Sequence, residues 1–243
     1  MKARLVVVGS SGRMGQAILR LAREGGFEVV GGVDSENHSL DCINQADAVI
    51  DFSHHSVTMD VVRTCVSAKK PLVIGTTGHC DQDRQAIQQA AKDIPLIFSA
   101  NYSVGVNLLF HLTKQVAEIL GDAYDQEIIE IHHRMKKDSP SGTARQLAEI
   151  LCKVKKESYA ENTRQGRVGD VGPRTSNEIG VHAVRGGDVV GEHTVLFAGI
   201  GERIELMHKA SSRDTFAAGA LRAAKWLIAR APGFYEMADV LEL

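Results

Sequence analysis

The most restrictive feature of this sequence is a strand, glycine-rich turn, helix, strand and acid in the first 34 residues. Leu5–Val8 is a continuous apolar run, which is typical of a strand buried on both faces of a parallel sheet. The turn GSSGRMG follows at Gly9–Gly15, and apolar residues then recur at helical spacing. A second apolar strand, Phe27–Val33, ends at Asp34. This order predicts a Rossmann-type dinucleotide-binding domain built on a parallel sheet.

The glycines have separate expected roles in such a unit. Gly9 permits the tight turn, Gly12 lets backbone N–H groups approach a pyrophosphate, and Gly15 lets the helix pack close to the strand. The phosphates would lie at the positive N-terminus of the helix. The alternative is a glycine-rich turn that binds no ligand.

Asp34 bears on the choice of cofactor. Its carboxylate can accept hydrogen bonds from both ribose hydroxyls, which favours NADH over NADPH. Ser35 follows it, so no basic partner for a 2′-phosphate stands there, and Arg13 is the nearby candidate.

Three more strands, Ala48–Phe52, Pro71–Ile74 and Pro95–Phe98, are expected in the same sheet. Each of them ends in small or polar residues. Ligands bind across the carboxyl ends of the strands in open α/β sheets, so these segments are expected to line a cleft. Ordinary turn chemistry would use the same residue types. The expected lining residues are Asp51, Phe52, Ser53, Gly75, Thr76, Thr77, Ser99, Ala100, Asn101 and Tyr102.

The pattern changes after residue 103. A helix is expected at Val106–Leu120, a strand at Glu127–Ile131, and a long polar loop at 157–178. Three alternating runs without helices between them then indicate a second α+β domain with a mixed or antiparallel sheet. Gly186-Gly187 is interpreted as the hairpin turn between the first two runs. The predicted domains are 1–103 with 212–243 for the dinucleotide and 104–211 for substrate binding and oligomerisation, with the C-terminal tail packed on the first domain.

The segment EIIEIHHRMKKDSPSGTA at Glu127–Ala144 concentrates the chemistry of this second domain. His132 and His133 lie at the end of its strand, where a histidine can be structural, catalytic or a metal ligand. Metal binding is disfavoured because adjacent strand residues point to opposite faces and no carboxylate or cysteine has a fitting spacing. Proton transfer by one of these histidines and a structural role both remain open.

Cations and a helix N-terminus follow the two histidines. Lys136 and Lys137 could be a solvated charge pair, but they precede Pro140-Ser141-Gly142-Thr143, where Ser141 or Thr143 is expected to cap a helix. Backbone N–H groups at a helix start bind anions, and a nearby cation suits a carboxylate. The segment therefore favours a small anionic substrate that is protonated as it reacts.

Composition excludes several classes. The net charge of −2 gives no basic field for nucleic acid or a membrane surface. No apolar run approaches a membrane span or a signal-peptide core, so a cytoplasmic protein is expected. The four cysteines lack metal-binding or disulfide spacing, and buried structural thiols are the expected role.

Several motifs, spread over nearly the whole chain, resemble those of one known family. GSSGRMG at Gly9, VIGTTG at Val73, SANYSVGVN at Ser99, the segment from Glu127 and HKASSRDTFAAGA at His208 resemble the dihydrodipicolinate reductase family. The resemblance implies NAD(P)H-dependent reduction of 4-hydroxy-tetrahydrodipicolinate, a cyclic dicarboxylate, to tetrahydrodipicolinate in diaminopimelate and lysine biosynthesis. It also implies a homotetramer assembled largely through the second domain.

Residue roles follow from the same resemblance. His132 matches the position of a proton donor or acceptor, and Lys136 matches a second catalytic position. Substrate contacts are implied for His133, Gly142 and Thr143, and cofactor contacts for Gly9–Met14, Asp34, Gly75–Thr77 and Ser99–Tyr102. The segment 36–47 is shorter than in several relatives, and some relatives have Arg where this chain has Ser35, so the choice between NADH and NADPH stays open.

Two rival functions fit parts of the sequence. A thioester-forming dehydrogenase would need a nucleophilic cysteine in the cleft. A cofactor-sensing regulator would use the first domain but leave the histidine and lysine segment without a purpose.

Overall fold

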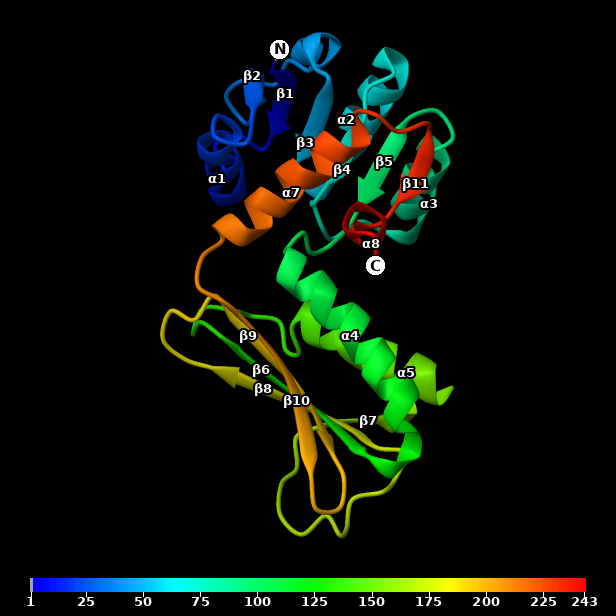
Figure 1. Ribbon diagram of the computed structural model, residues 1–243. Coiled ribbons are helices and arrows are strands. Elements are labelled where there is room, and N and C mark those ends of the chain that lie inside the picture. Colours follow the sequence, from blue (N-terminus) through cyan, green and yellow to red (C-terminus); the bar gives the residue numbers. More distant parts are fainter. Residues whose placement is uncertain (1) are drawn as a thin grey trace. The chain divides into compact units, whose positions relative to one another are not determined.

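The computed structural model describes residues 2–243 and divides into two compact units (Figure 1). One unit combines the chain up to Val104 with Arg213–Leu243, and the other is Gly105–Ser212. The chain thus leaves the first unit once and returns to it for its C-terminal helices and strand. No helix among residues 2–243 is long and apolar enough to cross a membrane.

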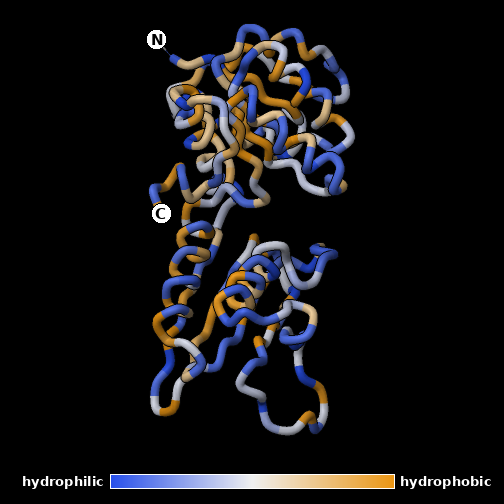
Figure 2. The backbone as a smooth tube through the Cα atoms, turned by 90° about the vertical axis from the view of Figure 1, so that its right-hand side faces the viewer, coloured by the Kyte–Doolittle hydropathy of each residue, from blue (hydrophilic) through white to orange (hydrophobic). Residues whose placement is uncertain are grey.

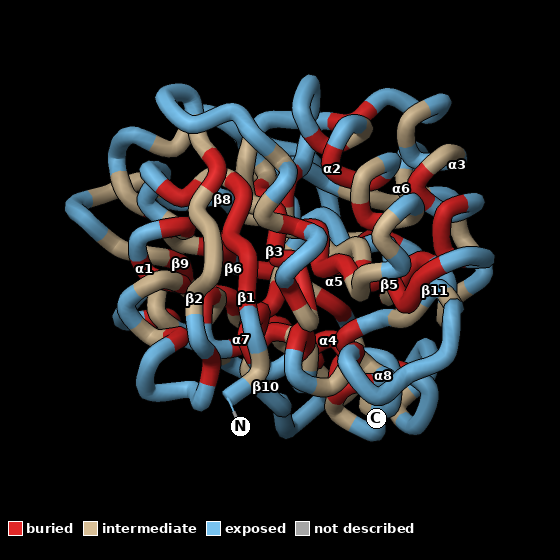
Figure 3. Tube along the Cα trace, turned by 90° about the horizontal axis from the view of Figure 1, so that it is seen from above, coloured by how far each residue is buried: buried red, intermediate tan, exposed pale blue. Residues whose placement is uncertain are grey.

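The first unit is a six-stranded parallel sheet in the order β11-β5-β4-β3-β1-β2. The five predicted strands are confirmed, and the tail adds a sixth, β11, beside β5. The strands are β1 Ala3–Val8, β2 Phe27–Val33, β3 Ala48–Asp51, β4 Leu72–Ile74, β5 Pro95–Phe98 and β11 Gly233–Tyr235. Figure 2 shows their apolar runs inside this unit, and Figure 3 shows β1 and β3 buried.

Alternation along each strand divides the core of this unit into two layers, because successive side chains point to opposite faces. Leu5 and Val7 of β1 pack with α1 and α7 on one face, whereas Val6 and Val8 pack with α2 and α3 on the other. The doubly covered sheet explains why β1 is a continuous apolar run. The helices are α1 Arg13–Ala22, α2 His55–Ala68, α3 Asp81–Ala90, α7 Asp214–Leu227 and α8 Met237–Leu241, with a 3₁₀ turn at Asp41–Gln45.

The second unit is a five-stranded mixed sheet in the order β10-β9-β6-β8-β7. Its central strand β6 runs parallel to β8 on one side and antiparallel to β9 on the other. The strands are β6 Asp125–His132, β7 Thr163–Gln165, β8 Ile179–Arg185, β9 Gly191–Ala198 and β10 Arg203–Ala210. The predicted mixed sheet is confirmed.

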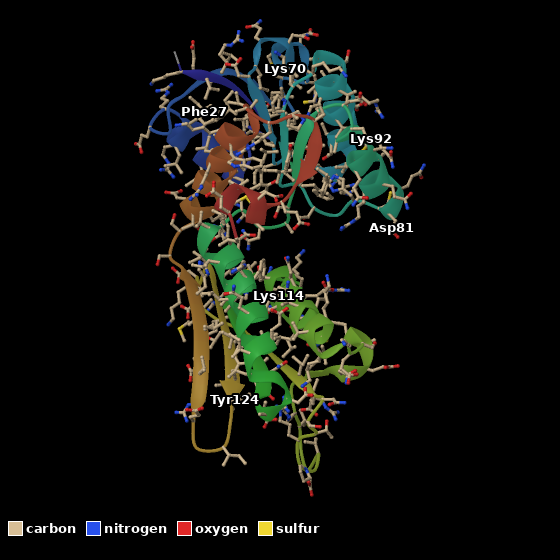
Figure 4. The ribbon with its side chains drawn as sticks, turned by 45° about the vertical axis from the view of Figure 1, so that its right-hand side comes forward. Phe27, Lys70, Asp81, Lys92, Lys114 and Tyr124 are labelled. Atoms are coloured by element: carbon tan, nitrogen blue, oxygen red, sulfur yellow. The ribbon has the colours of Figure 1, made fainter. Side chains whose placement is uncertain are left out.

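Helices cover one face of this second sheet. They are α4 Val104–Leu120, α5 Gly142–Lys155 and the short α6 Tyr159–Asn162, and a short 3₁₀ turn, Gly121–Ala123, follows α4. Ile128, Val195 and Phe197 from the strands pack with Leu109 and Leu147 from the helices. Lys114 lies on the solvent side of α4, and Tyr124 lies just before β6 (Figure 4).

Two predictions for this unit are wrong. Gly186-Gly187 is not a hairpin turn, because β8 and β9 flank β6 instead of pairing with each other. A turn signal cannot reveal that an earlier strand is inserted between two later ones. The segment 157–178 is not wholly a loop, since it contains α6 and the edge strand β7, both too short and polar to show a periodic pattern.

Candidate active site

The glycine-rich turn of the first unit has the close approaches that its sequence predicts. Gly9 has a φ of +84°, a left-handed conformation that favours glycine, and its N–H donates to the carbonyl of Val33 over 2.8 Å. A Cβ on Gly15 would lie 2.1 Å from the Gly9 carbonyl oxygen, so α1 can pack here only with glycine. Gly12 is the N-cap of α1 and makes no side-chain capping hydrogen bond.

Asp34 is fixed at the end of β2 by hydrogen bonds. Its Oδ1 accepts the N–H groups of Glu36 and Asn37 over 2.9 and 3.1 Å, and its Oδ2 accepts the Ser10 hydroxyl over 2.9 Å. These donors lower the pKa of the Asp34 carboxyl, so it is a fixed negative charge.

A cavity of about 520 Å³ opens beside this carboxylate within the first unit. It lies against the glycine-rich turn, and Ser35 and His38 are on its wall. Its lining is Val8, Gly9, Ser11, Gly12, Val33, Asp34, Ser35, His38, Leu40, Phe52, Ser53, His54, Val57 and Asp60. The volume and the fixed acid suit one half of a dinucleotide. Arg13 is exposed, and Met14 packs against the core, and neither is among the lining residues.

The loops after β4 and β5 differ in what their side chains can reach. Thr76 is buried and donates to Asp51, whereas Thr77 and Ala100 are exposed. Tyr102 points inward, with its hydroxyl donating to the main chain of β4 over 2.7 Å, so only its main chain is left for a ligand. Gly75 leaves room for the Phe52 ring, which lies 2.2 Å from its Cβ position.

Ser99 and Asn101 hold the turn after β5. The Ser99 hydroxyl donates to the Asn101 carbonyl over 2.9 Å, and the Asn101 side chain accepts from the N–H of Ser103. Both residues therefore shape the loop that was predicted to touch the cofactor.

In the second unit, His132 is the last residue of β6 and is held by an acid that the sequence reasoning missed. Its Nδ1 lies 2.5 Å from Oε2 of Glu130, whose side chain is fully buried. Glu130 and His132 share one face of the strand because side chains two residues apart point the same way. The same alternation, read along Glu130-Ile131-His132, could have identified Glu130 from the sequence.

Two further residues bind the carboxylate of Glu130. Arg185, from the end of β8, forms a two-point ion pair with the carboxylate, with distances of 2.8 and 2.9 Å. The N–H of Ser141, at the start of α5, donates to Oε1 over 3.0 Å. Burial alone would raise the pKa of Glu130, but the bonds from His132, Arg185 and Ser141 outweigh it and hold that pKa at about 2.

His193 on β9 packs against the cluster and contacts both His132 and Ser141. Its ring meets the His132 ring edge to face at 5.1 Å between centroids, and its Nε2 lies 3.1 Å from the Ser141 hydroxyl oxygen. Burial lowers the pKa of His193 to about 3, so it is neutral at physiological pH. Neither Arg185 nor His193 was expected from the sequence.

The residues between β6 and α5 present the predicted anion-binding groups. Lys136 is mostly buried and pairs with Asp138 over 2.9 Å. Ser141 is the N-cap of α5, its hydroxyl accepting from the N–H of Ala144, which resolves the choice between Ser141 and Thr143. Gly142 is exposed, with nothing within 4 Å of its Cβ position, and Thr143 is half-buried beside it.

The glycine pair that was expected to form a hairpin instead holds this loop. The N–H of Arg134 donates to the Gly187 carbonyl, the N–H of Gly186 to the His132 carbonyl, and the N–H of His133 to the Val189 carbonyl over 2.7 Å. The half-buried His133 is thus fixed by its main chain. Among residues 2–243, no group of three or more His, Cys, Asp or Glu side chains is placed to hold a metal ion.

A Rossmann-type nucleotide-binding unit and a second unit with a buried acid–histidine pair beside a lysine define a two-domain oxidoreductase. Two family models match consecutive parts of the chain, "Dihydrodipicolinate reductase, N-terminus" over residues 3–102 and "Dihydrodipicolinate reductase, C-terminus" over residues 105–241. The chain belongs to the dihydrodipicolinate reductase family.

Full-length relatives agree with this assignment. The chain is 53% identical over 240 residues to the 4-hydroxy-tetrahydrodipicolinate reductase of Akkermansia muciniphila, covering 98% of each chain. It is 44% identical over 265 residues to that of Myxococcus xanthus, covering 98% of this chain and 97% of the relative. Its fold matches the dipicolinate-bound dihydrodipicolinate reductase from Paenisporosarcina sp. TG-14 with a TM-score of 0.80 at 22% identity, over 98% and 99% of the two chains.

Proposed function

We propose that this protein reduces 4-hydroxy-tetrahydrodipicolinate to tetrahydrodipicolinate with a hydride from a nicotinamide dinucleotide, in diaminopimelate and lysine biosynthesis. Family membership supports the reaction, and the observation that carries the chemistry is the buried Glu130–His132 pair next to Lys136 and the start of α5. In this conversion the hydride replaces the hydroxyl group on the ring, which takes up a proton and leaves as water while the ring C=N is kept, and the second unit supplies the proton-bearing groups.

His132 and Lys136 are the proposed catalytic residues. The imidazole offers a nitrogen that can give or take a proton, and the ammonium of Lys136 is a donor of its own. The substrate carboxylates are proposed to bind His133 and the N–H groups of Gly142 and Thr143, where the positive end of α5 favours an anion.

The cofactor is proposed to bind the first unit, with NADH preferred over NADPH. The fixed negative charge of Asp34 suits ribose hydroxyls and repels a 2′-phosphate. The proposed contacts are Gly9, Ser10, Ser11, Gly12, Arg13, Met14, Asp34, Gly75, Thr76, Thr77, Ser99, Ala100, Asn101 and Tyr102. Ser10, Gly75, Thr76 and Tyr102 act chiefly through the shape and main chain of their loops, given the burial and packing of their side chains.

A homotetramer in the cytoplasm is part of this proposal. The face of the second sheet away from α4 and α5 exposes Ile129, Val184 and Met207, which are 37%, 46% and 53% exposed. Adjacent registers place Ile129 and Met207 in one row across β6, β9 and β10. An apolar sheet face of this kind fits association with further copies of the chain. Sedimentation velocity of wild type and Met207→Glu tests it, and a wild-type monomer would refute it.

The test of the reaction is NADH oxidation with substrate supplied by an upstream synthase. His132→Gln and Lys136→Met are each expected to lower kcat at least about 100-fold, the usual range for loss of a general acid or base. Lys153→Met, an exposed lysine at the far end of α5, is the matched control and should keep kcat. No turnover by the wild type, or full activity in both site variants, would refute the proposal.

The cofactor preference is tested by kcat/KM for NADH and NADPH in the wild type and in Asp34→Ser. Removing the fixed charge is expected to lower kcat/KM for NADH and to raise it for NADPH. An unchanged ratio would show that Asp34 does not set the preference.

A further inference from the structure

We infer that Glu130, held by Arg185, is a positioning residue that fixes the proton of His132 on Nδ1 and thereby leaves Nε2 as the nitrogen that exchanges a proton in the reaction. This inference rests on the proposed function of His132. It concerns residues on three strands and one helix start, all within the second unit.

The tautomer follows from the chemistry of the partners. Glu130 has no exposed side-chain surface and takes four hydrogen bonds: from Nδ1 of His132, from both terminal nitrogens of Arg185 and from the N–H of Ser141. An arginine and a backbone N–H can only donate, and with the positive charge of Arg185 they hold the carboxylate ionised, with its pKa at about 2. An ionised carboxylate can only accept, so Nδ1 of His132 must carry a hydrogen.

The surroundings of the other nitrogen agree with this assignment. Nε2 of His132 forms no hydrogen bond with another protein atom of residues 2–243, and it is the atom nearest to the Cβ position of Gly191, at 3.0 Å. Glycine at 191 therefore keeps space beside Nε2 that any other residue would fill. His193 does not compete for the proton, because it is neutral and its Nε2 is already bonded to Ser141.

Arg185 has a second contact that fixes its own position. One of its terminal nitrogens also donates to the Asp138 carbonyl over 2.6 Å, in the loop that carries Lys136. The same guanidinium therefore joins the acid behind His132 to the loop of the second catalytic residue. Its ion pair with Glu130 also keeps the charge of the buried carboxylate compensated.

Glu130→Gln is the informative change because it keeps the shape and exchanges one acceptor for an N–H₂ donor. Turned toward Ser141, that donor would face a backbone N–H, which can only donate and so cannot accept a hydrogen bond from it. In either orientation the new donor faces one N–H of Arg185, but turned toward His132 its other contact is satisfied if the imidazole becomes an acceptor at Nδ1 and moves its proton to Nε2. The variant is therefore expected to hold the wrong tautomer.

The comparable change of an acid to an amide behind a catalytic histidine lowers kcat by about 10⁴ in the serine-protease triad. We expect kcat of Glu130→Gln to fall at least about 100-fold. KM should change by less than about threefold, because His133, Gly142 and Thr143 are untouched.

The matched control is Glu127→Gln. Glu127 lies on β6 with its side chain on the other face and forms a similar cluster, bonded to Arg167, Arg174 and His182, with a pKa held at about 2. Its loss should destabilise the same strand without touching His132. We expect kcat within about threefold of the wild type.

The direct measurement is ¹⁵N NMR of the full-length protein labelled on histidine, recorded from pH 6 to 10. His132→Gln identifies the signal by its absence. The expected result is the Nδ1–H tautomer in the wild type and in Glu127→Gln, and the Nε2–H tautomer in Glu130→Gln. An Nε2–H tautomer in the wild type, an unchanged tautomer in Glu130→Gln, or equal loss of kcat in both glutamate variants would overturn the inference.

The two arms separate this inference from the proposed function. The NMR arm requires no substrate, so the expected tautomers without any turnover of the dicarboxylate would refute the reaction and leave the role of Glu130 in holding the imidazole. Turnover by the wild type with the opposite tautomer would refute only the role of Glu130.

Discussion

Protonation of His193 is expected to make the second unit less stable as the pH falls below 7. The pKa of His193 is about 3 in the folded chain because burial opposes its charge, and the pKa of an unfolded imidazole is about 6.5. Below pH 6.5 the unfolded state therefore binds a proton that the folded state does not. The stability from this residue is complete above pH 6.5 and is lost progressively toward pH 3.

The free energy of unfolding is expected to fall by about 2 kcal/mol between pH 7.5 and pH 5 because of His193. At pH 5 protonation favours the unfolded state by a factor of about 30, whereas at pH 7.5 the factor is close to one, which gives about 2 kcal/mol of lost stability. This value depends only on a folded pKa well below 5. His193→Gln and His193→Leu remove the titrating group and should each flatten the pH dependence by that amount.

Amide hydrogen exchange of peptides from β6 and β9 measures this locally. At each pH the ratio of wild-type to variant exchange rates cancels the intrinsic effect of pH. The ratio is expected to rise about 30-fold between pH 7.5 and 5, as the wild type alone loses stability. A ratio that stays constant for both variants would show that His193 accepts a proton in the folded chain, and the reasoning from burial would be wrong.

Four further changes have expected outcomes. Gly15→Ala would put a Cβ 2.1 Å from a carbonyl oxygen of the turn, so NADH affinity, measured by fluorescence titration, should fall at least about tenfold. Gly191→Ala would crowd Nε2 of His132, so kcat/KM should fall while the Kd for NADH stays unchanged. Tyr102→Phe removes a buried hydrogen bond and should lower the free energy of unfolding in urea by about 1 kcal/mol. Glu127 adds stability above pH 4.5 that is lost as the pH falls toward 2, and Glu127→Gln should show a flatter acid-unfolding curve.

The first unit was predictable because its signals are local. Each strand is a short apolar run closed by turn residues, and Gly9, Gly15 and Asp34 stand at fixed spacings along one stretch of chain. The strand missed there, β11, has only three residues, Gly233–Tyr235, and pairs with β5 from more than 130 positions away. Nothing in three residues distinguishes such a strand from a loop.

The site in the second unit was half predictable for the same reason. His132, Lys136 and Ser141 stand within ten residues, so their types and order indicate an anion site with proton transfer. Glu130 was also within reach, since alternation along β6 places it beside His132.

Arg185 and His193 required the order of the strands, which no local pattern contains. β6 lies between β8 and β9, so the two strands that follow one another in the chain place their residues on opposite sides of Glu130 and His132. The register pairs His132 with Arg185 on β8 and Glu130 with His193 on β9. Had Gly186-Gly187 formed a tight hairpin, β8 and β9 would pair with each other, and one of these side chains would lie a strand away from the acid. The insertion of β6 thus places the cationic Arg185 and the neutral His193 on either side of the buried carboxylate. Gly186-Gly187, which form no hairpin, instead make main-chain hydrogen bonds to the loop that carries Lys136.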